Sequence, residues 1–243
     1  MKTFKPLLLF SFLLTILALQ TKCAKTDDVE PIVSNSNSNN DSTNNDSTSV
    51  TIADDTVYIN SIISGFILNE VLYDPPGGGP GDTDNGDANN DGIRDPFEDE
   101  FVEFVNTSNS CINISGCKIF DEENLISNIP NHVFPDSTFI NPNQAVVVFG
   151  GGDTVGPFGG ALVFISSNVV LDLQNGSSSG PGDKITFTDS SGNILIEFDI
   201  DPLSNNPNES YTRDPDLTGL FVQHNSVSGT LFSPGTRTDG TPF

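Results

Sequence analysis

The sequence predicts an all-β domain, built as a β-sandwich or a β-barrel, with a long acidic loop inserted between two early strands. Short runs rich in valine, isoleucine and phenylalanine recur along the chain, and turn residues separate them. The 243 residues include 22 glycines and 16 prolines but only one methionine and no tryptophan. Such a composition is typical of short strands joined by many turns.

Residues 1–22 have the features of an export signal. Lys2 and Lys5 give it a positive start, and the apolar run that follows is too short to span a bilayer stably. Cys23 comes next, which resembles a bacterial lipoprotein signal in which this cysteine becomes the acylated N-terminus. Lys22 stands where such signals usually carry a small residue, so simple secretion is the alternative.

Residues 23–55 form a predicted disordered tether, and residues 56–243 form the folded domain. The stretch 34–49 consists only of Asn, Ser, Asp and Thr. Ordering it would cost conformational entropy without burying apolar surface. Residues 25–28 are similar to the surface-export tails of Bacteroidetes lipoproteins. We therefore expect an outer membrane lipoprotein of the cell envelope, attached to the membrane by a lipid on Cys23 and exposed at the surface.

The folded domain begins with two predicted strands that bracket the acidic loop. Gly65–Tyr73 is rich in β-branched and aromatic residues, and the two prolines after it end the strand. Glu100–Asn106 is an apolar run that only Glu103 interrupts, which predicts a largely buried strand. A short strand at Val57–Ile59 precedes both.

Ten further short strands are predicted along the rest of the chain. The runs 112–114 and 117–120 are predicted to pair as a hairpin, and so are the runs 184–188 and 194–198. The predicted strands are Ile112–Ile114, Cys117–Phe120, His132–Phe134, Ala145–Phe149, Leu162–Ile165, Val169–Leu173, Lys184–Thr188, Ile194–Phe198, Tyr211–Arg213 and Phe221–His224.

The acidic loop contains the most specific motif in the chain. Asp87 to Glu98 fits the twelve-residue calcium-loop pattern D-x-[DN]-x-[DN]-G-x5-E, with Gly92 at position 6. Calcium takes six to eight oxygen ligands, and alternate residues of a tight loop can point inward together. The predicted ligands are the side chains of Asp87, Asn89, Asp91, Asp95 and Glu98 and the main-chain carbonyl of Ile93.

The end of the loop favours the same interpretation. Asp95 is a good helix N-cap, Pro96 suits the first helical position, and a helical turn there would bring Glu98 back over the ion. No amphipathic helix precedes the loop, so the motif does not belong to an EF-hand helix pair. A solvated acidic turn is the alternative, because Asp, Asn and Gly are common turn formers.

The charge of the chain limits the classes of partner that it is expected to bind. It has 33 acidic residues against nine Lys and Arg, a net charge of −24. This argues against nucleic acids and anionic membrane surfaces as ligands, because both are polyanions. It favours metal cations and basic surfaces instead.

The cysteines and histidines offer no catalytic or zinc-site pattern. Outside the cytoplasm, Cys111 and Cys117 either form a disulfide or remain two small thiols, and the spacing leaves both open. His132 and His224 lack the Cys or His neighbours that a zinc site needs. Both are interpreted as strand or turn residues.

A series of stretches in the folded domain carries a family resemblance through its order. The stretches are Ile67–Pro75, Gly86–Gly92, Asp99–Asn106, Ile114–Cys117, Phe134–Pro135, Ala145–Gly151, Ser210–Arg213 and Ser233–Thr236. Together they resemble the lamin tail domain, in its bacterial secreted form, over roughly residues 66–243. Cys117 stands where family members often carry tryptophan. The resemblance implies an immunoglobulin-like β-sandwich and a surface location, without an enzyme activity.

These observations favour a non-enzymatic, surface-tethered binding or structural module with a structural calcium ion. Its ligand would be a surface protein or a glycan, and no nucleic-acid partner is expected. The alternative is a calcium-dependent hydrolase that acts on nucleic acid or polysaccharide. Such an enzyme needs a cleft, a base and an open coordination position. The sequence offers no base beyond the acids of the loop itself.

Overall fold

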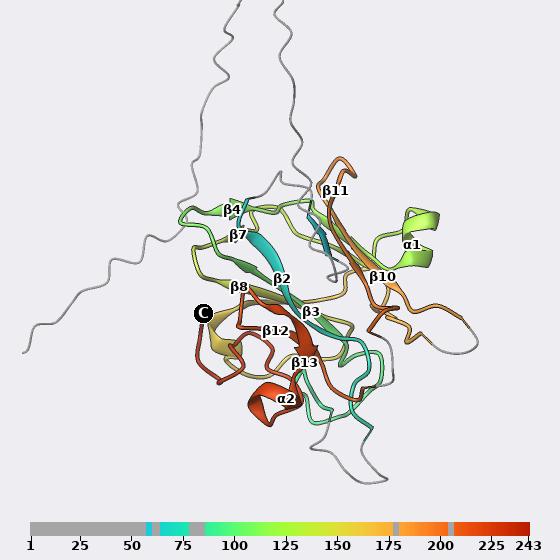
Figure 1. Cartoon of the computed structure of the whole chain (residues 1–243). Helices are drawn as coiled ribbons and strands as arrows, with labels where there is room; N and C mark the ends of the chain where they lie inside the picture. Colours follow the sequence, from blue (N-terminus) through green and yellow to red (C-terminus); the bar gives the residue numbers. More distant parts are fainter. Residues whose placement is uncertain (1–56, 60–63, 78–85, 177–179, 204–206) are drawn as a thin grey trace, which may run out of the picture.

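The computed structural model describes residues 57–59, 64–77, 86–176, 180–203 and 207–243, which form packed β-sheets with short helices (Figure 1). The predicted all-β sandwich is confirmed. The predicted export signal, Cys23 and the tether lie outside the described residues.

One sheet has five antiparallel strands. Their order across the sheet is β1 (Val57–Ile59), β11 (Ile194–Asp199), β10 (Lys184–Thr188), β5 (Lys118–Phe120) and β6 (His132–Val133). The predicted hairpin between β10 and β11 is confirmed, with Phe187 opposite Ile196. A helix, α1 (Glu122–Ser127), lies beside β10.

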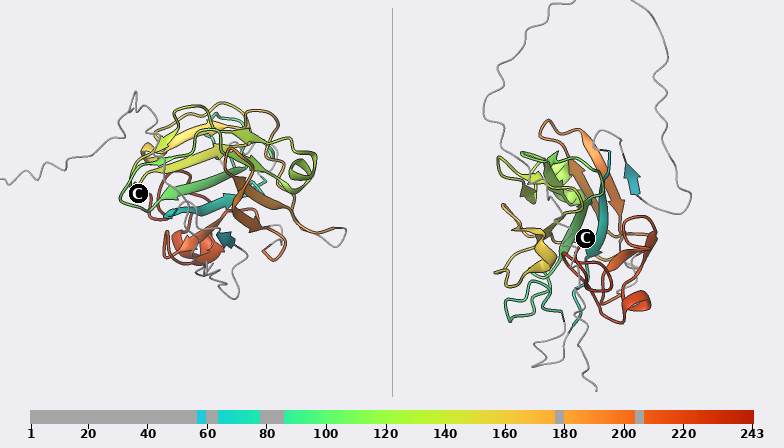
Figure 2. Two further views of the ribbon diagram at one scale, coloured as in Figure 1. Left: turned by 90° about the horizontal axis from the view of Figure 1, so that it is seen from above. Right: turned by 90° about the vertical axis from the view of Figure 1, so that its left-hand side faces the viewer.

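The second sheet has six strands. Their order is β13 (Leu220–Gln223), β12 (Tyr211–Asp214), β2 (Phe66–Leu72), β3 (Phe101–Asn106), β8 (Ala145–Phe149) and β9 (Leu162–Ile165). All neighbours are antiparallel except β8 and β9, which run parallel. A four-residue helix, α2 (Asn225–Ser228), follows β13, and Figures 1 and 2 show it far from α1.

The predicted hairpin over residues 112–120 is wrong. Its first strand, β4 (Ile112–Asn113), pairs with β7 (Phe139–Ile140) in a small separate sheet. The second strand, β5, pairs with β6 and β10 instead. The turn at Gly116, whose φ is 72°, therefore passes the chain from one sheet to another rather than folding it back on itself.

The predicted strand at Val169–Leu173 is also wrong, because this segment is irregular. Its carbonyl groups are satisfied by a side chain instead of a neighbouring strand. The amide of Asn131 donates to the carbonyls of Val170 (2.8 Å) and Leu171 (3.1 Å). Leu171 still points into the core, which explains the apolar pattern of the sequence there.

The core lies between the two sheets. Phe66 and Phe104 from the six-stranded sheet stack with ring centroids 5.3 Å apart, and Phe187 from the five-stranded sheet lies 5.1 Å from Phe104. All three rings are buried. Aromatic contacts of this kind add stability beyond the apolar area that they bury.

The six-stranded sheet is buried on its outer face as well. Leu72, Phe101 and Phe149 project away from the main core and form a second cluster with Ala88 in a loop and Phe158 in the 3-10 helix η1 (Phe158–Gly160). Every residue of β3 is consequently buried, which accounts for its nearly continuous apolar run.

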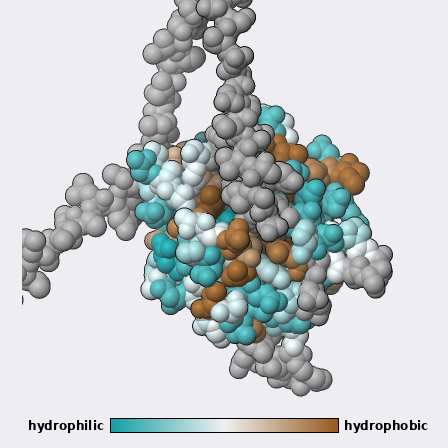
Figure 3. All heavy atoms as spheres, viewed as in Figure 1, coloured by the Kyte–Doolittle hydropathy of each residue, from teal (hydrophilic) through white to brown (hydrophobic). Residues whose placement is uncertain are grey.

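The described helices are short, and none of them is long and apolar enough to cross a membrane. The face shown in Figure 3 is mainly hydrophilic, with separate apolar patches. The most exposed large apolar side chain is Ile126 on α1, at 82 %.

We predict that His132→Phe flattens the loss of stability on acidification. His132 is buried between Phe134 and Phe164, and burial lowers the pKa of its imidazole to about 4. As the pH falls, the His132 imidazole of the unfolded chain therefore takes up a proton near pH 6.5, whereas that of the folded chain stays neutral until about pH 4. Stability from this group is present above pH 6.5 and is lost as the pH falls toward 4.

Urea unfolding at pH 7.5 and pH 4.5 gives the change in the free energy of unfolding with pH for the wild type and for the variant. The difference between these two changes measures the effect of His132. Other titrating groups are common to both proteins and cancel. An identical pH dependence in the two proteins would contradict the prediction.

Candidate functional site

The first half of the predicted calcium loop is held by its own side chains. Asp87 Oδ2 accepts from the backbone N–H of Gly92 (2.9 Å), and Asn89 Oδ1 accepts from that of Asp91 (3.0 Å). Asp91 Oδ1 accepts from Ile93 N–H (2.8 Å). Gly92 has a φ of 93°, which suits the glycine of the motif. One oxygen of Asp87 and one of Asp91 therefore shape the loop. The other oxygen of Asp91 accepts from Asp153 N–H (3.3 Å), whereas Asp87 Oδ1 has no hydrogen-bond partner.

The second half contains the predicted helical turn. Asp95 Oδ1 accepts from the N–H groups of Phe97 (2.9 Å) and Glu98 (3.2 Å), as an N-cap does. Asp99 N–H donates to the Asp95 carbonyl (3.2 Å) and closes one turn. The turn thus brings Glu98 back toward the start of the loop.

Hydrogen bonds to the Asp99 carboxylate connect the two ends of the loop. Its Oδ1 accepts from the N–H groups of Ala88 (2.7 Å) and Asn89 (3.1 Å), and its Oδ2 accepts from Asp95 N–H (2.7 Å). Asp99 is fully buried, and burial raises the pKa of its carboxyl to about 6, although the three backbone donors oppose the shift. The calcium pattern does not include this residue.

Three predicted ligands converge on a glycine from another segment. A Cβ added to Gly152 would lie 2.6 Å from Asn89 Nδ2, 2.8 Å from Asp91 Oδ2 and 3.1 Å from Glu98 Oε2. Gly152 also has a φ of 71°. The glycine run after β8 therefore lies directly against the loop.

The other two glycines after β8, Gly150 and Gly151, also lie close to the loop. A Cβ at Gly150 would lie only 1.8 Å from the carbonyl oxygen of Phe97, so no larger residue fits there. Gly151 N–H donates to the Glu98 carbonyl (3.2 Å), and Gly150 N–H donates to that of Glu100 (2.8 Å). These contacts fix the loop against the end of β8.

The structure does not gather all six predicted ligands into one shell. Among the described residues, no three His, Cys, Asp or Glu side chains are grouped so that they could hold a metal ion by themselves. Asp95 Oδ1 is used as the cap of the turn. However, Asp87 Oδ1 is buried without a hydrogen-bond partner. An unpaired buried carboxylate oxygen is costly, and a cation would relieve that cost.

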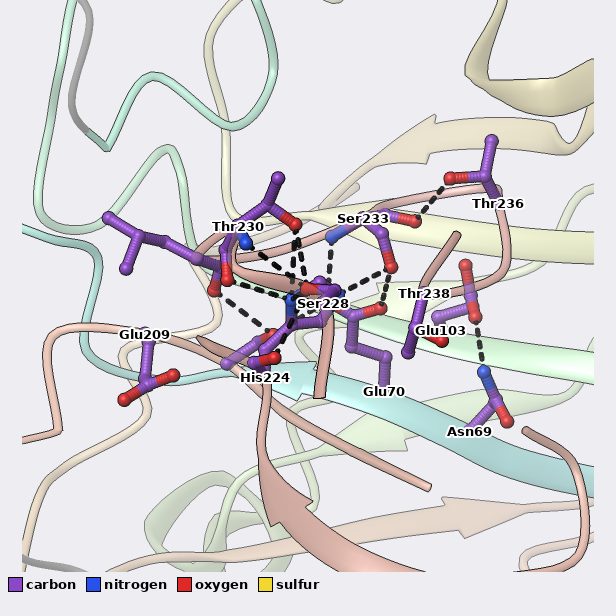
Figure 4. A network of polar contacts seen from close by, with 12 residues as sticks. Asn69, Glu70, Glu103, Glu209, His224, Ser228, Thr230, Ser233, Thr236 and Thr238 are labelled. Carbon is purple, nitrogen blue, oxygen red and sulfur yellow. Dashed lines mark hydrogen bonds and ion pairs between the residues drawn. The ribbon is translucent and has the colours of Figure 1, made fainter. Parts of the chain in front are cut away.

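A second polar cluster lies on the outer face of the six-stranded sheet (Figure 4). Glu70 on β2 is completely buried. Its Oε1 accepts from Ser210 Oγ (2.6 Å) and from Ser233 N–H (2.9 Å), and its Oε2 accepts from Ser233 Oγ (2.8 Å). Burial raises the pKa of Glu70, while His224 and these hydrogen bonds oppose the shift.

Glu103 lies directly opposite Glu70 on β3. It accepts from Asn69 Nδ2 (2.9 Å) and from Gly235 N–H (2.7 Å). Burial and the neighbouring Glu70 hold the pKa of Glu103 well above its ordinary range. Two buried carboxyl groups therefore face each other, and the segment 233–235 donates to both.

The cluster contains a serine, a histidine and a glutamate, but these are not arranged as a catalytic triad. His224 Nε2 lies 2.8 Å from Ser233 Oγ and 3.9 Å from Glu70 Oε1. In a triad the carboxylate would accept from the other ring nitrogen. That nitrogen, Nδ1, instead faces the Thr230 carbonyl (3.0 Å) and Ser228 Oγ (2.7 Å). The contacts fix the imidazole in the fold, as expected for a structural histidine.

Cys111 and Cys117 neither form a disulfide with each other nor remain two thiols, which were the two alternatives that the sequence left open. Cys117 is a free thiol in the core, and burial raises its pKa to about 11. Cys111 lies on the exposed side of the chain and is disulfide-bonded. The two sulfurs thus belong to different environments, because the turn at Gly116 directs Cys117 inward.

We predict that Ser233→Ala destabilises the fold by about 1–3 kcal/mol, because it leaves Glu70 and His224 buried with fewer partners. Ser226→Ala is the matched control, since it removes an exposed hydroxyl that also forms one hydrogen bond. Urea unfolding measures both changes. Equal losses in the two variants would contradict a special role for the buried network.

Comparison with known proteins agrees with this architecture. A family model for the lamin tail domain matches residues 61–201. No curated protein matches the chain. The matched segment ends before β12 and β13, which complete the six-stranded sheet. It also ends before the segment 233–235, which donates hydrogen bonds to both buried glutamates.

Proposed function

Because the chain belongs to the lamin tail domain family, we propose that it is a non-enzymatic, surface-tethered module for binding or structural support, stabilised by calcium. The calcium ion would occupy the loop 87–98. Its partners would be the membrane, reached through an N-terminal lipid anchor, and a surface protein or glycan.

The convergence of Asn89, Asp91 and Glu98 beside Gly152 is the observation that carries the calcium proposal. The converging atoms are the oxygens Asp91 Oδ2 and Glu98 Oε2 and the nitrogen Asn89 Nδ2, and the unpartnered Asp87 Oδ1 adds a third side-chain oxygen in the same loop. Because carboxylates alone do not form the group, the amide oxygen of Asn89 and main-chain carbonyls would complete the shell. Binding would draw these oxygens closer and relieve the repulsion between the carboxylates.

The stability that calcium would supply grows with the logarithm of its concentration relative to the Kd of the site. The gain is RT ln(1 + [Ca]/Kd), about 1–3 kcal/mol at roughly 10- to 100-fold saturation. Extracellular calcium sites with weak affinity are saturated only at millimolar concentrations. A structural role outside the cell therefore requires no tight binding.

We predict that calcium raises the melting temperature of the wild-type protein by several degrees over chelator, and that Asp91→Ala abolishes most of this rise. Gly152→Ala should do the same, because its Cβ would push against three ligands. Asp136→Ala, which removes an exposed acid outside the loop, should retain the full rise.

The informative quantity is the difference in melting temperature between calcium and chelator, because Asp91 also accepts hydrogen bonds from Ile93 N–H in the loop and from Asp153 N–H outside it, and Asp91→Ala removes both. Differential scanning calorimetry measures it for all four proteins. An unchanged increment in Asp91→Ala, or no increment in the wild type, would contradict calcium binding by the loop and favour the solvated acidic turn instead.

We also propose that Cys23 carries the lipid anchor. Mass spectrometry of the N-terminal peptide from the exported protein should find an acylated residue 23, and Cys23→Ala should release the protein from the membrane fraction. Recovery of residue 23 in a peptide that is disulfide-linked to Cys111, instead of acylated, would contradict the lipid anchor. A peptide cleaved elsewhere and free of lipid would favour simple secretion.

A further inference from the structure

Residues 231–235 form a short segment that closes over the outer face of the six-stranded sheet. Its Phe232 side chain packs against the second apolar cluster. A Cβ at Gly235 would lie 2.2 Å from the carbonyl oxygen of Phe158, so only glycine lets the segment approach η1 this closely. The segment therefore completes the apolar cover on this side of the sheet.

The same segment donates hydrogen bonds to two buried carboxyl groups (Figure 4). Ser233 N–H donates to Glu70 (2.9 Å), and Gly235 N–H donates to Glu103 (2.7 Å). The two glutamates lie directly opposite each other on β2 and β3 and are completely buried. Two negative charges at neighbouring buried positions repel each other strongly. The closed structure consequently favours a pair that holds one negative charge and one proton.

The hydrogen bonds favour the charge on Glu70 and the proton on Glu103. Glu70 accepts from three donors, and its Oε1 lies 3.9 Å from His224 Nε2. Glu103 accepts from two of the described donors. Burial and the neighbouring Glu70 raise the pKa of Glu103 well above its ordinary range. A carboxyl group with more donors is better stabilised in its charged form, so Glu103 is the one that keeps the proton.

The elements around Glu103 bring acidic and apolar side chains close to it. The half-buried Asp216, in the turn between β12 and β13, raises the pKa of Glu103 further, and β8 places Val147 opposite it. Arg213 on β12 lies over an aromatic ring of the main core instead. Glu209, which precedes β12, accepts from the first N–H of α2 (2.6 Å). Loss of the proton would therefore leave two carboxylates buried side by side.

We propose that the segment 231–235 is a pH-sensitive latch, which opens with the release of one proton from the Glu70–Glu103 pair. In the open state water reaches both carboxyl groups, and they ionise in their ordinary range. The closed latch is thus most stable below about pH 4.5, and it loses stability as the pH rises from there to the raised pKa of Glu103. Opening uncovers the apolar cluster beneath Phe232. The latch is independent of the calcium proposal.

Amide hydrogen exchange of the full chain, followed by NMR from about pH 5 to about pH 7 in constant calcium, tests this inference. The protection factor is the exchange rate of an unfolded amide divided by the measured rate, which removes the intrinsic pH dependence of exchange. The protection factors of Ser233 and Gly235 should fall about tenfold per pH unit, because opening releases one proton. They should also be smaller than those of the β10–β11 hairpin, which opens only with the whole domain.

Glu103→Gln, which mimics the protonated side chain, should abolish most of this fall. Glu123→Gln is the matched control, since it neutralises an exposed acid on α1, and it should retain the fall. Protection that does not change with pH in the wild type, an unchanged fall in Glu103→Gln, or equal protection of the latch and the hairpin would overturn the inference.

A second measurement on the wild type covers the case in which Glu103→Gln does not fold. Carbon-13 NMR of the glutamate carboxyl groups should show that one member of the Glu70–Glu103 pair is still protonated at about pH 6, where an ordinary glutamate is ionised. Ionisation of both members by that pH would reject the latch.

Discussion

Two glutamates that face each other across buried strands impose the main constraint on this fold. Glu70 and Glu103 lie opposite one another on β2 and β3, and both are completely buried. Two carboxyl groups in such a position are tolerated only when hydrogen-bond donors surround them. The donors Ser210, Ser233 and Gly235 come from the last part of the chain. The outer face of the sheet is thus closed by the segment that follows the matched family region.

The candidate calcium loop also depends on a buried carboxyl group that is surrounded by hydrogen-bond donors. Asp99 is a buried carboxyl that accepts three backbone N–H groups and joins the ends of the loop. The glycines after β8 let the loop approach the sheet without a side chain between them. The loop and the glycine run after β8 therefore form one packed region.

Local features of the structure could be predicted from the sequence, whereas pairings between distant segments could not. The hairpin of β10 and β11 was predictable because its turn and both strands are contiguous. The run at 112–120 has an equally good local pattern, but its partners lie elsewhere in the chain. Glu70 resembles an ordinary solvent-facing strand residue, because the segment that covers it is more than a hundred residues away. The calcium motif indicated the loop, but not Asp99 or Gly152.

The position of the covering segment also sets the order in which the molecule can be completed. A chain that emerges from its N-terminus contains β2 and β3 more than a hundred residues before Ser233 and Gly235 follow. Until these two residues follow, the paired glutamates lack the backbone N–H donors that Ser233 and Gly235 supply. The outer face of the six-stranded sheet can consequently be completed only after the segment 233–235 is available.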